Sequence, residues 1–273
     1  MAAMINPDWK NAALLLVGHG SSKVESGRLA ACRLAEQLEA SGLFAEVKAC
    51  FWKEEPYLSL DLVQSRTVYV VPYFSGEGVF TRRLIPQTLE LNGPLTVKDG
   101  RRIYYAAPVG AHDDIPRLLR QRALELCAAQ AIFPAAATLL VIAHGSSKPG
   151  GAKGTPERIA DLLRQDSPFA EVITSYIEQE PFVADWPALV TGSTVLAAPL
   201  LLSEGMHASQ DLPPLFGLTT VEGGPSAIHG KTAWLMGGIG RDPEMVEIIL
   251  DLIRCCDATK NVTPPEGLGR IAP

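Results

Sequence analysis

The sequence predicts an α/β protein of two similar subdomains, each a parallel β-sheet flanked by helices in the doubly wound manner. Short apolar runs alternate with helical patterns along the chain, and this order occurs twice. Of the 273 residues, 47% are hydrophobic and 20% are charged, which is typical of a globular protein with a sizeable core. Strands that alternate with helices favour parallel sheets covered by helices on both faces.

The two halves are a duplication. The pentapeptide His-Gly-Ser-Ser-Lys begins at both His19 and His144, and the tetrapeptide at 44–47 recurs at 169–172 with the same spacing of 125 residues. Pro72 and Pro199 are 127 apart, as a two-residue insertion in a surface loop would give. We predict a first subdomain at 1–130, a second at 131–258 and a tail at 259–273.

The elements follow in the same order in each half. The first half has strand patterns at 14–18, 46–52, 67–74 and 102–110. The second has strand patterns at 138–143, 171–177, 194–202 and 232–240, with helical patterns between and after them at 155–163, 180–190, 209–218 and 242–256. Thr155 followed by Pro156 predicts an N-cap and a first helical position. Between the halves, at 127–138, Ala and Pro replace the helical pattern.

Composition excludes several classes of function. The net charge is −6 and no block of Lys and Arg stands out, which argues against nucleic acid or an anionic membrane as the main partner. The N-terminal apolar run is too short for a signal peptide or a membrane span. Five cysteines without a C-x-x-C pair predict no zinc or disulfide framework, and the adjacent Cys255 and Cys256 are expected to be buried. We expect a cytoplasmic protein.

Candidate chemistry lies at the carboxyl ends of the strands, where parallel sheets bind ligands. His144, Glu178 and His207 follow three successive predicted strands of the second half. Two imidazoles and a carboxylate suit a divalent transition metal, and a neutral imidazole can also accept a proton near neutral pH. Alone, a histidine in a Gly-Ser-Ser turn more often braces the next helix. Glu180 is the alternative to Glu178.

The first half lacks this set. Phe80 stands where the second half has His207, Lys53 stands near the place of Glu178, and only His19 remains. We therefore predict a degenerate first half and an active second half. Arg82 and Arg83 at the same edge are either a solvated pair or a clamp for substrate carboxylates.

Other polar features are weaker. The Gly-Ser-Ser turn can bind an anion at the N-terminus of the next helix, but it lacks the spacing of a nucleotide-binding loop. His112 and His229 lie in turn-like segments and are expected at the surface. The Gly-rich segment 219–231 is either a mobile lid or an ordinary connection.

Three motifs together resemble the CbiX/SirB group of class II tetrapyrrole chelatases. They are AHGSS at 143–147, IEQEP at 177–181 and HASQDLP at 207–213. The resemblance covers nearly the whole chain. It implies two α/β subdomains that face each other across a cleft, so that a monomer with an internal pseudo-twofold axis holds one complete cleft, with a homodimer as the alternative.

The resemblance also implies a lyase activity, the insertion of Co²⁺, Fe²⁺ or Ni²⁺ into sirohydrochlorin or a related acidic tetrapyrrole. The products would be cobalt-sirohydrochlorin on the way to cobalamin, siroheme, or a nickel derivative. The metal is a substrate, and no permanently bound cofactor is expected. The family's metal-binding and catalytic residues carry over onto His144, Glu178 and His207, and the expected substrate contacts are Ser146, Ser147, Arg82, Arg83 and His19.

Because the substrate carries many carboxylates and the chain is acidic, local cations are needed at the mouth, where Lys148 and Lys153 join Arg82 and Arg83. Two alternatives stay open. One is a non-catalytic carrier or sensor that binds a tetrapyrrole or a metal. The other is an enzyme of different chemistry on the same fold.

Overall fold

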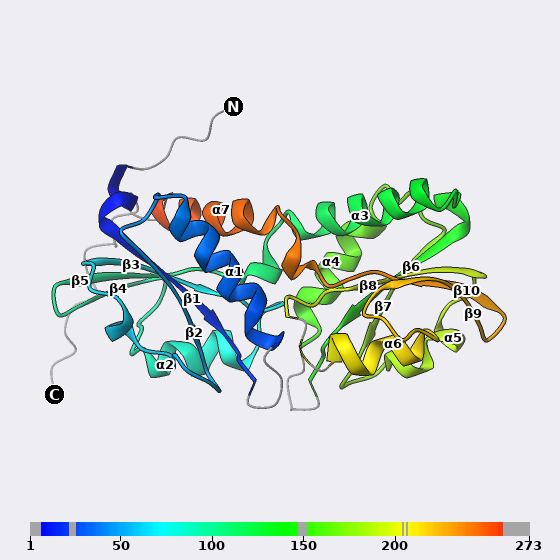
Figure 1. The fold of residues 1–273 in the computed structure, drawn as a ribbon, viewed down its shortest axis with the longest axis horizontal. Helices are drawn as coiled ribbons and strands as arrows, with labels where there is room; N and C mark the ends of the chain where they lie inside the picture. The colour runs from blue at the N-terminus through cyan, green and yellow to red at the C-terminus, as the bar shows by residue number, and fades with distance from the viewer. Residues whose placement is uncertain (1–6, 22–25, 147–151, 204, 206, 259–273) are drawn as a thin grey trace, which may run out of the picture.

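The computed structural model describes residues 7–21, 26–146, 152–203, 205 and 207–258. It contains two five-stranded sheets, one from each half of the chain (Figure 1). The strand order is β2-β1-β3-β5-β4 in the first sheet and β7-β6-β8-β10-β9 in the second. In each sheet four strands are parallel and the last, β4 or β9, is antiparallel to its neighbour.

The first-half strands are β1 (Ala12–Gly18), β2 (Glu46–Phe51), β3 (Thr67–Pro72), β4 (Leu95–Lys98) and β5 (Arg101–Tyr105). The second-half strands are β6 (Ala137–Ala143), β7 (Glu171–Tyr176), β8 (Thr194–Pro199), β9 (Gly223–Ile228) and β10 (Lys231–Leu235). The α-helices are α1 (Ser26–Ala40), α2 (Ile85–Thr88), α3 (Ile115–Ala129), α4 (Gly154–Arg164), α5 (Trp186–Leu189), α6 (Leu212–Leu215) and α7 (Met245–Ala258). The predicted fold class is confirmed.

The central strands explain why the strand prediction works. Every residue of β1 and β6 is buried, because each strand has a neighbour on both sides and helices over both faces. Strands in this position are near-continuous apolar runs. The register also repeats, since Leu14 pairs with Val47 and Leu139 pairs with Val172.

The antiparallel edge strands were not predicted. The segment 219–231 is neither a lid nor an irregular connection, because β9 pairs with β10 in a hairpin. His229 and Gly230 form its turn with φ of 51° and 71°, the left-handed pair that two-residue hairpin loops favour. Two glycines and a proline in β9 hide the strand from a propensity argument, and an edge strand tolerates them.

The two halves exchange their last helices. In Figure 1, α7 of the second half covers the first sheet, and α3 of the first half covers the second sheet. Helix α7 contacts β3 and α1, while α3 contacts β8 and α4. One continuous core cluster therefore contains residues of both halves, including Tyr69 and Leu139. The predicted boundary at residue 130 divides the sequence repeat. In space, α3 and α7 each pack on the sheet of the other half.

Buried polar contacts connect the halves. The carboxylate of Asp257 in α7 accepts hydrogen bonds from Trp9 Nε1 at 2.8 Å and from the Tyr69 hydroxyl at 2.5 Å. The buried Tyr73 hydroxyl lies 3.0 Å from the carbonyl oxygen of Gly240 and 3.2 Å from that of Leu202. An unpaired buried polar group costs about 1–3 kcal/mol, so these contacts favour one relative placement of the halves.

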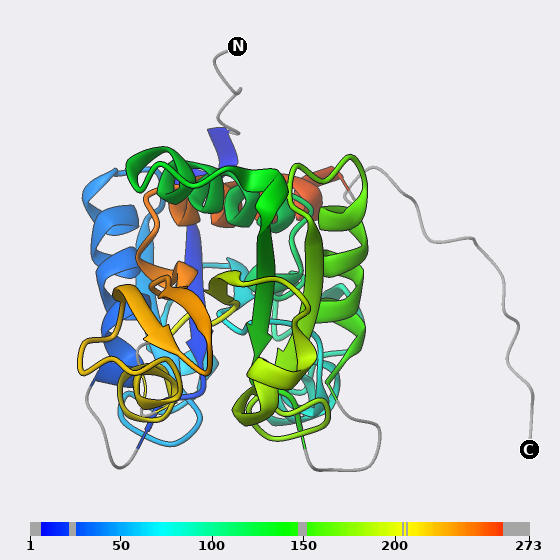
Figure 2. The same cartoon turned by 90° about the vertical axis from the view of Figure 1, so that its right-hand side faces the viewer.

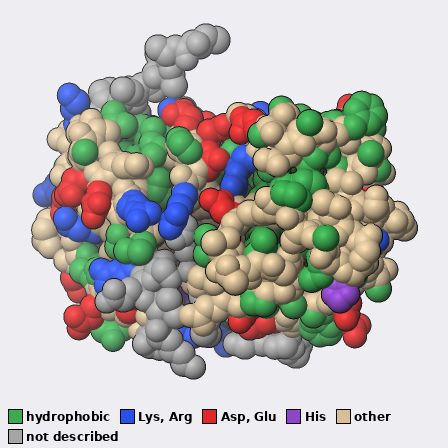
Figure 3. All heavy atoms as spheres, turned by 45° about the vertical axis from the view of Figure 1, so that its right-hand side comes forward, with side chains coloured by type: hydrophobic (Ala, Val, Ile, Leu, Met, Phe, Trp, Pro, Cys, Tyr) green, Lys and Arg blue, Asp and Glu red, His purple; other side chains and the backbone are tan. Residues whose placement is uncertain are grey.

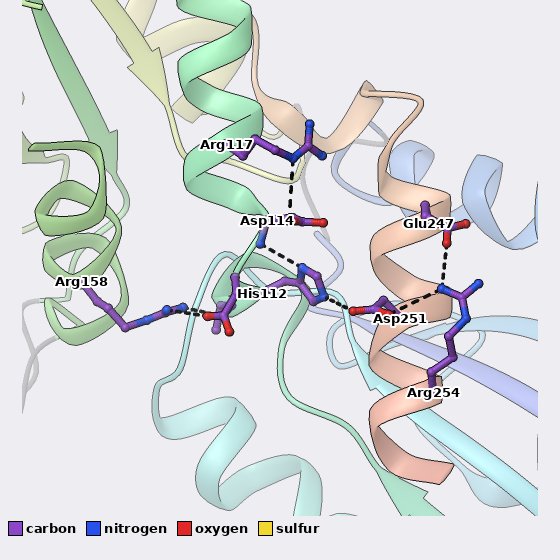
Figure 4. A network of polar contacts seen from close by, with 9 residues as sticks. His112, Asp114, Arg117, Arg158, Glu247, Asp251 and Arg254 are labelled. Atoms are coloured by element: carbon purple, nitrogen blue, oxygen red, sulfur yellow. Dashed lines mark hydrogen bonds and ion pairs between the residues drawn. The ribbon is translucent and has the colours of Figure 1, made fainter. Parts of the chain in front are cut away.

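His112 is not the surface residue that its turn-like sequence predicts. Its side chain is only 9% exposed, because α7 of the other half lies against it. The Asp114 N–H donates to Nδ1 at 3.1 Å, so Nε2 carries the proton and donates to Asp251 at 3.1 Å (Figure 4). Arg254 extends this network along α7. By contrast, His229 is exposed, as predicted.

Two smaller expectations are also wrong. Helix α4 begins at Gly154, and Thr155 is buried inside its first turn rather than at the N-cap. Its hydroxyl accepts the Glu77 N–H at 3.1 Å, since the loop after β3 of the first half docks there. Cys256 is buried as expected, but Cys255 is exposed, because adjacent helical residues point in different directions.

The surface carries charges of both signs. On the face drawn in Figure 3, Lys and Arg side chains lie next to Asp and Glu side chains. Several pairs join the two halves, such as Arg158 with Asp113 at 2.7 Å and Arg117 with Glu244. Over the part of the chain that the structure describes, no helix is long and apolar enough to cross a membrane.

Candidate functional site

The two histidine turns occupy equivalent places. His19 follows β1 and His144 follows β6, and both strands run away from the layer of α3 and α7 toward the opposite side of the molecule (Figure 2). The Glu178 N–H donates to the His144 carbonyl at 2.9 Å, and the Lys53 N–H donates to the His19 carbonyl at 3.0 Å. Lys53 is therefore the direct counterpart of Glu178. Glu180 lies two residues further on, in an exposed turn.

Local hydrogen bonds select the same tautomer of the neutral ring in both histidines. His144 Nδ1 lies 3.1 Å from the carbonyl oxygen of Gly145, and His19 Nδ1 lies 3.0 Å from that of Gly20. A carbonyl oxygen only accepts, so a neutral ring in this position carries its proton on Nδ1 and its lone pair on Nε2. The two glycines adopt φ of 75° and 71°, which lets the chain turn back this tightly. Each turn thus presents an imidazole whose Nε2 can bind a metal or accept a proton.

Glu178 lies beside His144. Its Oε2 atom is 3.8 Å from His144 Nδ1, and both side chains are 44% exposed. Partial exposure means that the electrostatic coupling is modest, and it also means that a dissolved cation can reach both groups. The pair therefore supplies an imidazole nitrogen and a carboxylate at one open edge.

Side chains that the sequence interpretation missed brace the two turns. Gln179 Oε1 accepts the N–H groups of Ser146 at 2.7 Å and Ala152 at 3.3 Å. In the first half, Glu54 accepts the Ser21 N–H at 2.9 Å. The Ser146 N–H is thus already bonded, and an anion role for this turn would rest on other groups. The repeat spacing could have indicated that Glu54 and Gln179 have equivalent roles, since they are 125 residues apart, but neither belongs to a familiar motif.

The third-strand segments also correspond. Phe80 and His207 each open a π-helical turn, at Phe80–Leu84 and His207–Asp211. The Arg82 N–H donates to the Gly78 carbonyl at 2.9 Å, and the Ser209 N–H donates to the Gly205 carbonyl at 3.1 Å. This confirms that Phe80 stands in the place of His207.

Part of the predicted site lies outside the described residues. These parts are the His207 side chain and all of Ser147 and Lys148. Among the side chains that the structure does describe, no three His, Cys, Asp or Glu converge as a metal site. The trio of His144, Glu178 and His207 therefore stays a prediction.

The first half presents an aromatic surface around His19. The His19 ring centroid is 4.8 Å from that of Phe80 and 6.4 Å from that of Phe74, and the Trp52 and Phe80 centroids are 5.6 Å apart. Burial lowers the pKa of His19, and the nearby Lys53 and His144 lower it further, against the effect of the Gly20 hydrogen bond. His19 is therefore neutral at neutral pH.

The predicted carboxylate-binding cations have other neighbours as well. Arg82, whose side chain is 72% exposed, forms an ion pair with Glu77 of its own loop. Arg83 is exposed. The Lys153 ammonium lies 5.4 Å from the centre of the Tyr176 ring. All three cations can reach solvent, and their role toward a substrate stays a prediction.

Comparison with known proteins agrees with the duplication. The CbiX family model matches twice, at residues 13–126 and 138–255. A protein of Halobacterium salinarum named as a probable sirohydrochlorin cobaltochelatase is 31% identical over 269 residues, which cover 90% of this chain and 91% of that protein.

Two solved structures share the fold. DR2241 from Deinococcus radiodurans, described as a multi-domain protein with structural similarity to chelatases, superposes with a TM-score of 0.68 at 27% identity. The match covers 88% of this chain but 54% of DR2241, which has two additional domains. SirB from Bacillus subtilis with Fe³⁺ superposes with a TM-score of 0.70 at 22% identity, over 91% of this chain and 96% of SirB. With two equivalent sheets, two equivalent histidine turns and a family match in each half, the chain belongs to the CbiX family as a tandem duplication within one polypeptide.

Proposed function

We propose that this protein is a chelatase that inserts a divalent metal, Co²⁺, Fe²⁺ or Ni²⁺, into sirohydrochlorin or a closely related acidic tetrapyrrole. The two family matches and the similarity to a probable sirohydrochlorin cobaltochelatase support the reaction class. The observation that carries the proposal for this chain is the placement of Glu178 beside His144, at a strand edge where the other half has a lysine.

In this proposal the second half receives the metal ion, which is a substrate. His144 keeps its Nε2 lone pair because Nδ1 donates to Gly145, and the Glu178 carboxylate lies on the same open edge. His207 opens the third segment of that edge and would supply the second imidazole. Ligands that leave coordination positions open are typical of sites where a metal reacts or is exchanged.

Metallation removes two protons from the pyrrole nitrogens as the metal takes their place. A divalent cation close to the macrocycle favours the loss of these protons. Glu178 can accept one of them, and the neutral His19 on the opposite wall is suited to accept the other. Ser146, Ser147, Arg82 and Arg83 would then contact the peripheral carboxylates, with guanidinium groups offering paired donors.

The test is anaerobic absorbance of sirohydrochlorin with each metal, with and without protein. We expect acceleration by the wild type and at least a tenfold loss in both His144→Ala and Glu178→Gln. Glu180→Gln, which changes an exposed carboxylate two residues away, is the matched control and should keep full activity. Equal losses in Glu178→Gln and Glu180→Gln would contradict the assignment of Glu178.

The same assay separates a chelatase from a non-catalytic carrier. The specific observation that favours a carrier is the loss of the metal residues in the first half, where Lys53 and Phe80 replace Glu178 and His207. A carrier would shift the sirohydrochlorin spectrum in proportion to protein without accelerating metallation.

A further inference from the structure

We infer that the first half binds the face of the macrocycle opposite the metal, through an aromatic wall made of Trp52, Phe74 and Phe80, with Lys53 placed to meet a peripheral carboxylate. This inference rests on the proposed function, because it takes the tetrapyrrole as the ligand. It gives the degenerate half a role of its own: it holds the ring while the second half delivers the metal.

The wall is a connected set of rings. Phe80 lies at its centre, with the Phe74 centroid at 5.8 Å and an interplanar angle of 22°, and the Trp52 centroid at 5.6 Å and 82°. His19 meets the Phe80 ring edge-on at 4.8 Å. The rings therefore surround the imidazole that ends β1, which is the ligand edge of this sheet.

The difference between the halves affects three positions together. Backbone hydrogen bonds align Trp52 with Ile177, because their N–H groups donate to Gly18 and Ala143 at the ends of the equivalent strands. The same one-to-one alignment of the segments after β3 and β8 places Phe74 opposite Leu201 and Phe80 opposite His207. Of these three positions, only position 80 corresponds to a predicted metal residue, so loss of the metal site does not account for the aromatic residues at 52 and 74. Three aromatic rings at one edge form a flat apolar surface instead.

None of these rings is fully buried, although Phe74 also packs against the core of the first sheet. Trp52, Phe74 and Phe80 are all half-buried, whereas Trp9, Trp186 and Trp234 are 1%, 1% and 8% exposed. Partly exposed, contiguous aromatic surface is unfavourable in water and marks a place where an apolar partner binds. A planar macrocycle with apolar faces matches it, since aromatic rings gain most from offset or edge-to-face contacts.

Charge supports this orientation. Lys53 is exposed at the same strand end as Trp52, and it occupies the place of Glu178. An ammonium there repels a divalent cation and attracts a carboxylate. The strands that end at His19 and His144 run toward the same side of the molecule (Figure 2), so the wall and the predicted metal residues lie at one side of the fold. The macrocycle would lie between them, with the metal entering from the His144 side.

The test separates ring binding from metal binding. Metal-free sirohydrochlorin is titrated anaerobically into Trp52→Ile, which takes the second-half residue, and into Phe80→Leu. Co²⁺ binding without tetrapyrrole is measured by equilibrium dialysis. We expect the sirohydrochlorin Kd to rise about 3- to 10-fold in each variant, with unchanged Co²⁺ affinity. In turnover, KM should rise while kcat changes by less than about twofold. Phe133→Ala is the control, since Phe133 is 74% exposed and lies just before β6, at the other end of the sheet.

The outcomes distinguish this inference from the proposed function. Unchanged Kd in both folded variants overturns the aromatic wall, whether or not the wild type is a chelatase. Weaker ring binding in the variants, together with no metallation by the wild type, keeps the wall and rejects the chelatase.

A second measurement, acrylamide quenching of tryptophan fluorescence, uses the wild-type protein. Trp52 is the accessible tryptophan, so bound sirohydrochlorin should at least halve its quenching by acrylamide. Unaltered quenching at saturating sirohydrochlorin would also overturn the inference. Trp52→Phe, which keeps a ring, should bind sirohydrochlorin better than Trp52→Ile.

Discussion

Two substitutions should give the first half a metal site of its own. Lys53→Glu with Phe80→His reproduces the residue types of the second half. The backbone already presents these positions equivalently, since the carbonyls of His19 and His144 accept from residues 53 and 178 at 3.0 and 2.9 Å. In the turns that begin at residues 80 and 207, the equivalent backbone hydrogen bonds, from Arg82 to Gly78 and from Ser209 to Gly205, are 2.9 and 3.1 Å long. We expect Co²⁺ binding to rise from one to two ions per chain.

The change carries a modest cost in stability. Phe80 contacts three other rings in a half-buried place, and an aromatic pair contributes about 0.5–1.5 kcal/mol beyond its buried area. Because a histidine keeps part of each contact, we expect a loss of about 1–3 kcal/mol in the free energy of unfolding. Replacing the ammonium of Lys53 also removes one cause of the lowered pKa of His19, so that ring should protonate at higher pH than before.

Equilibrium dialysis with Co²⁺ gives the number of ions, and urea unfolding gives the stability. The control is Lys53→Gln with Phe80→Leu, which removes the same two side chains without supplying ligands and should still bind one ion. Adding His207→Ala to the restored chain should return its stoichiometry to one. If the restored chain unfolds cooperatively and yet binds a single ion, the first half lacks more than these two side chains, and the one-to-one alignment does not explain its loss of metal binding.

The remaining predictions concern stability and the histidine turn. Asp257→Ala removes the acceptor used by Trp9 and Tyr69, and should lower the free energy of unfolding in urea by about 2–4 kcal/mol; a loss below about 1 kcal/mol would contradict the contact between the halves. Burial and the Asp257 hydrogen bond raise the pKa of Tyr69, so its unfolded form loses a proton near pH 10 while its folded form does not. The contribution of Tyr69 to the free energy of unfolding is thus complete below about pH 10 and falls as the pH rises above it. The urea midpoint should therefore decrease with pH above about pH 10, and this decrease should be smaller in Tyr69→Phe. Gly145→Ala should lower the metallation rate at least tenfold, because Gly145 has a φ of 75° and a Cβ there would lie only 2.6 Å from a neighbouring side-chain atom. Gly154→Ala is the control, since a Cβ at that position meets open space and should leave the rate unchanged.

Much of the fold follows from the sequence because the repeat is strong. Fully apolar runs mark β1 and β6, and the constant spacing fixes which residues of the two halves correspond. The structure adds that Lys53, which the sequence places only near the position of Glu178, is its direct counterpart.

The exchange of helices does not follow from the sequence. Helices α3 and α7 each have a buried face, but an amphipathic pattern does not tell which sheet that face covers. His112 shows the consequence. Its local sequence is that of an exposed turn, and it is buried because a helix from the other half of the chain lies against it. The misassignment of Thr155 has the same origin, since the loop that binds it comes from the first half.

This exchange explains how the two halves can differ at the carboxyl ends of their strands and still share one architecture. The first sheet needs α7 for its core, and the second sheet needs α3, so neither half can unfold without exposing the apolar face of the other. Substitutions inside the shared core are therefore costly to both halves, whereas substitutions among the half-exposed side chains at the carboxyl ends of the strands cost less. Divergence is expected there, and it is there that Lys53, Trp52 and Phe80 differ from their counterparts. A duplicated fold with one shared core and two open edges can keep its architecture while the edges diverge, as the proposed division between a cation-binding edge and a ring-binding edge requires.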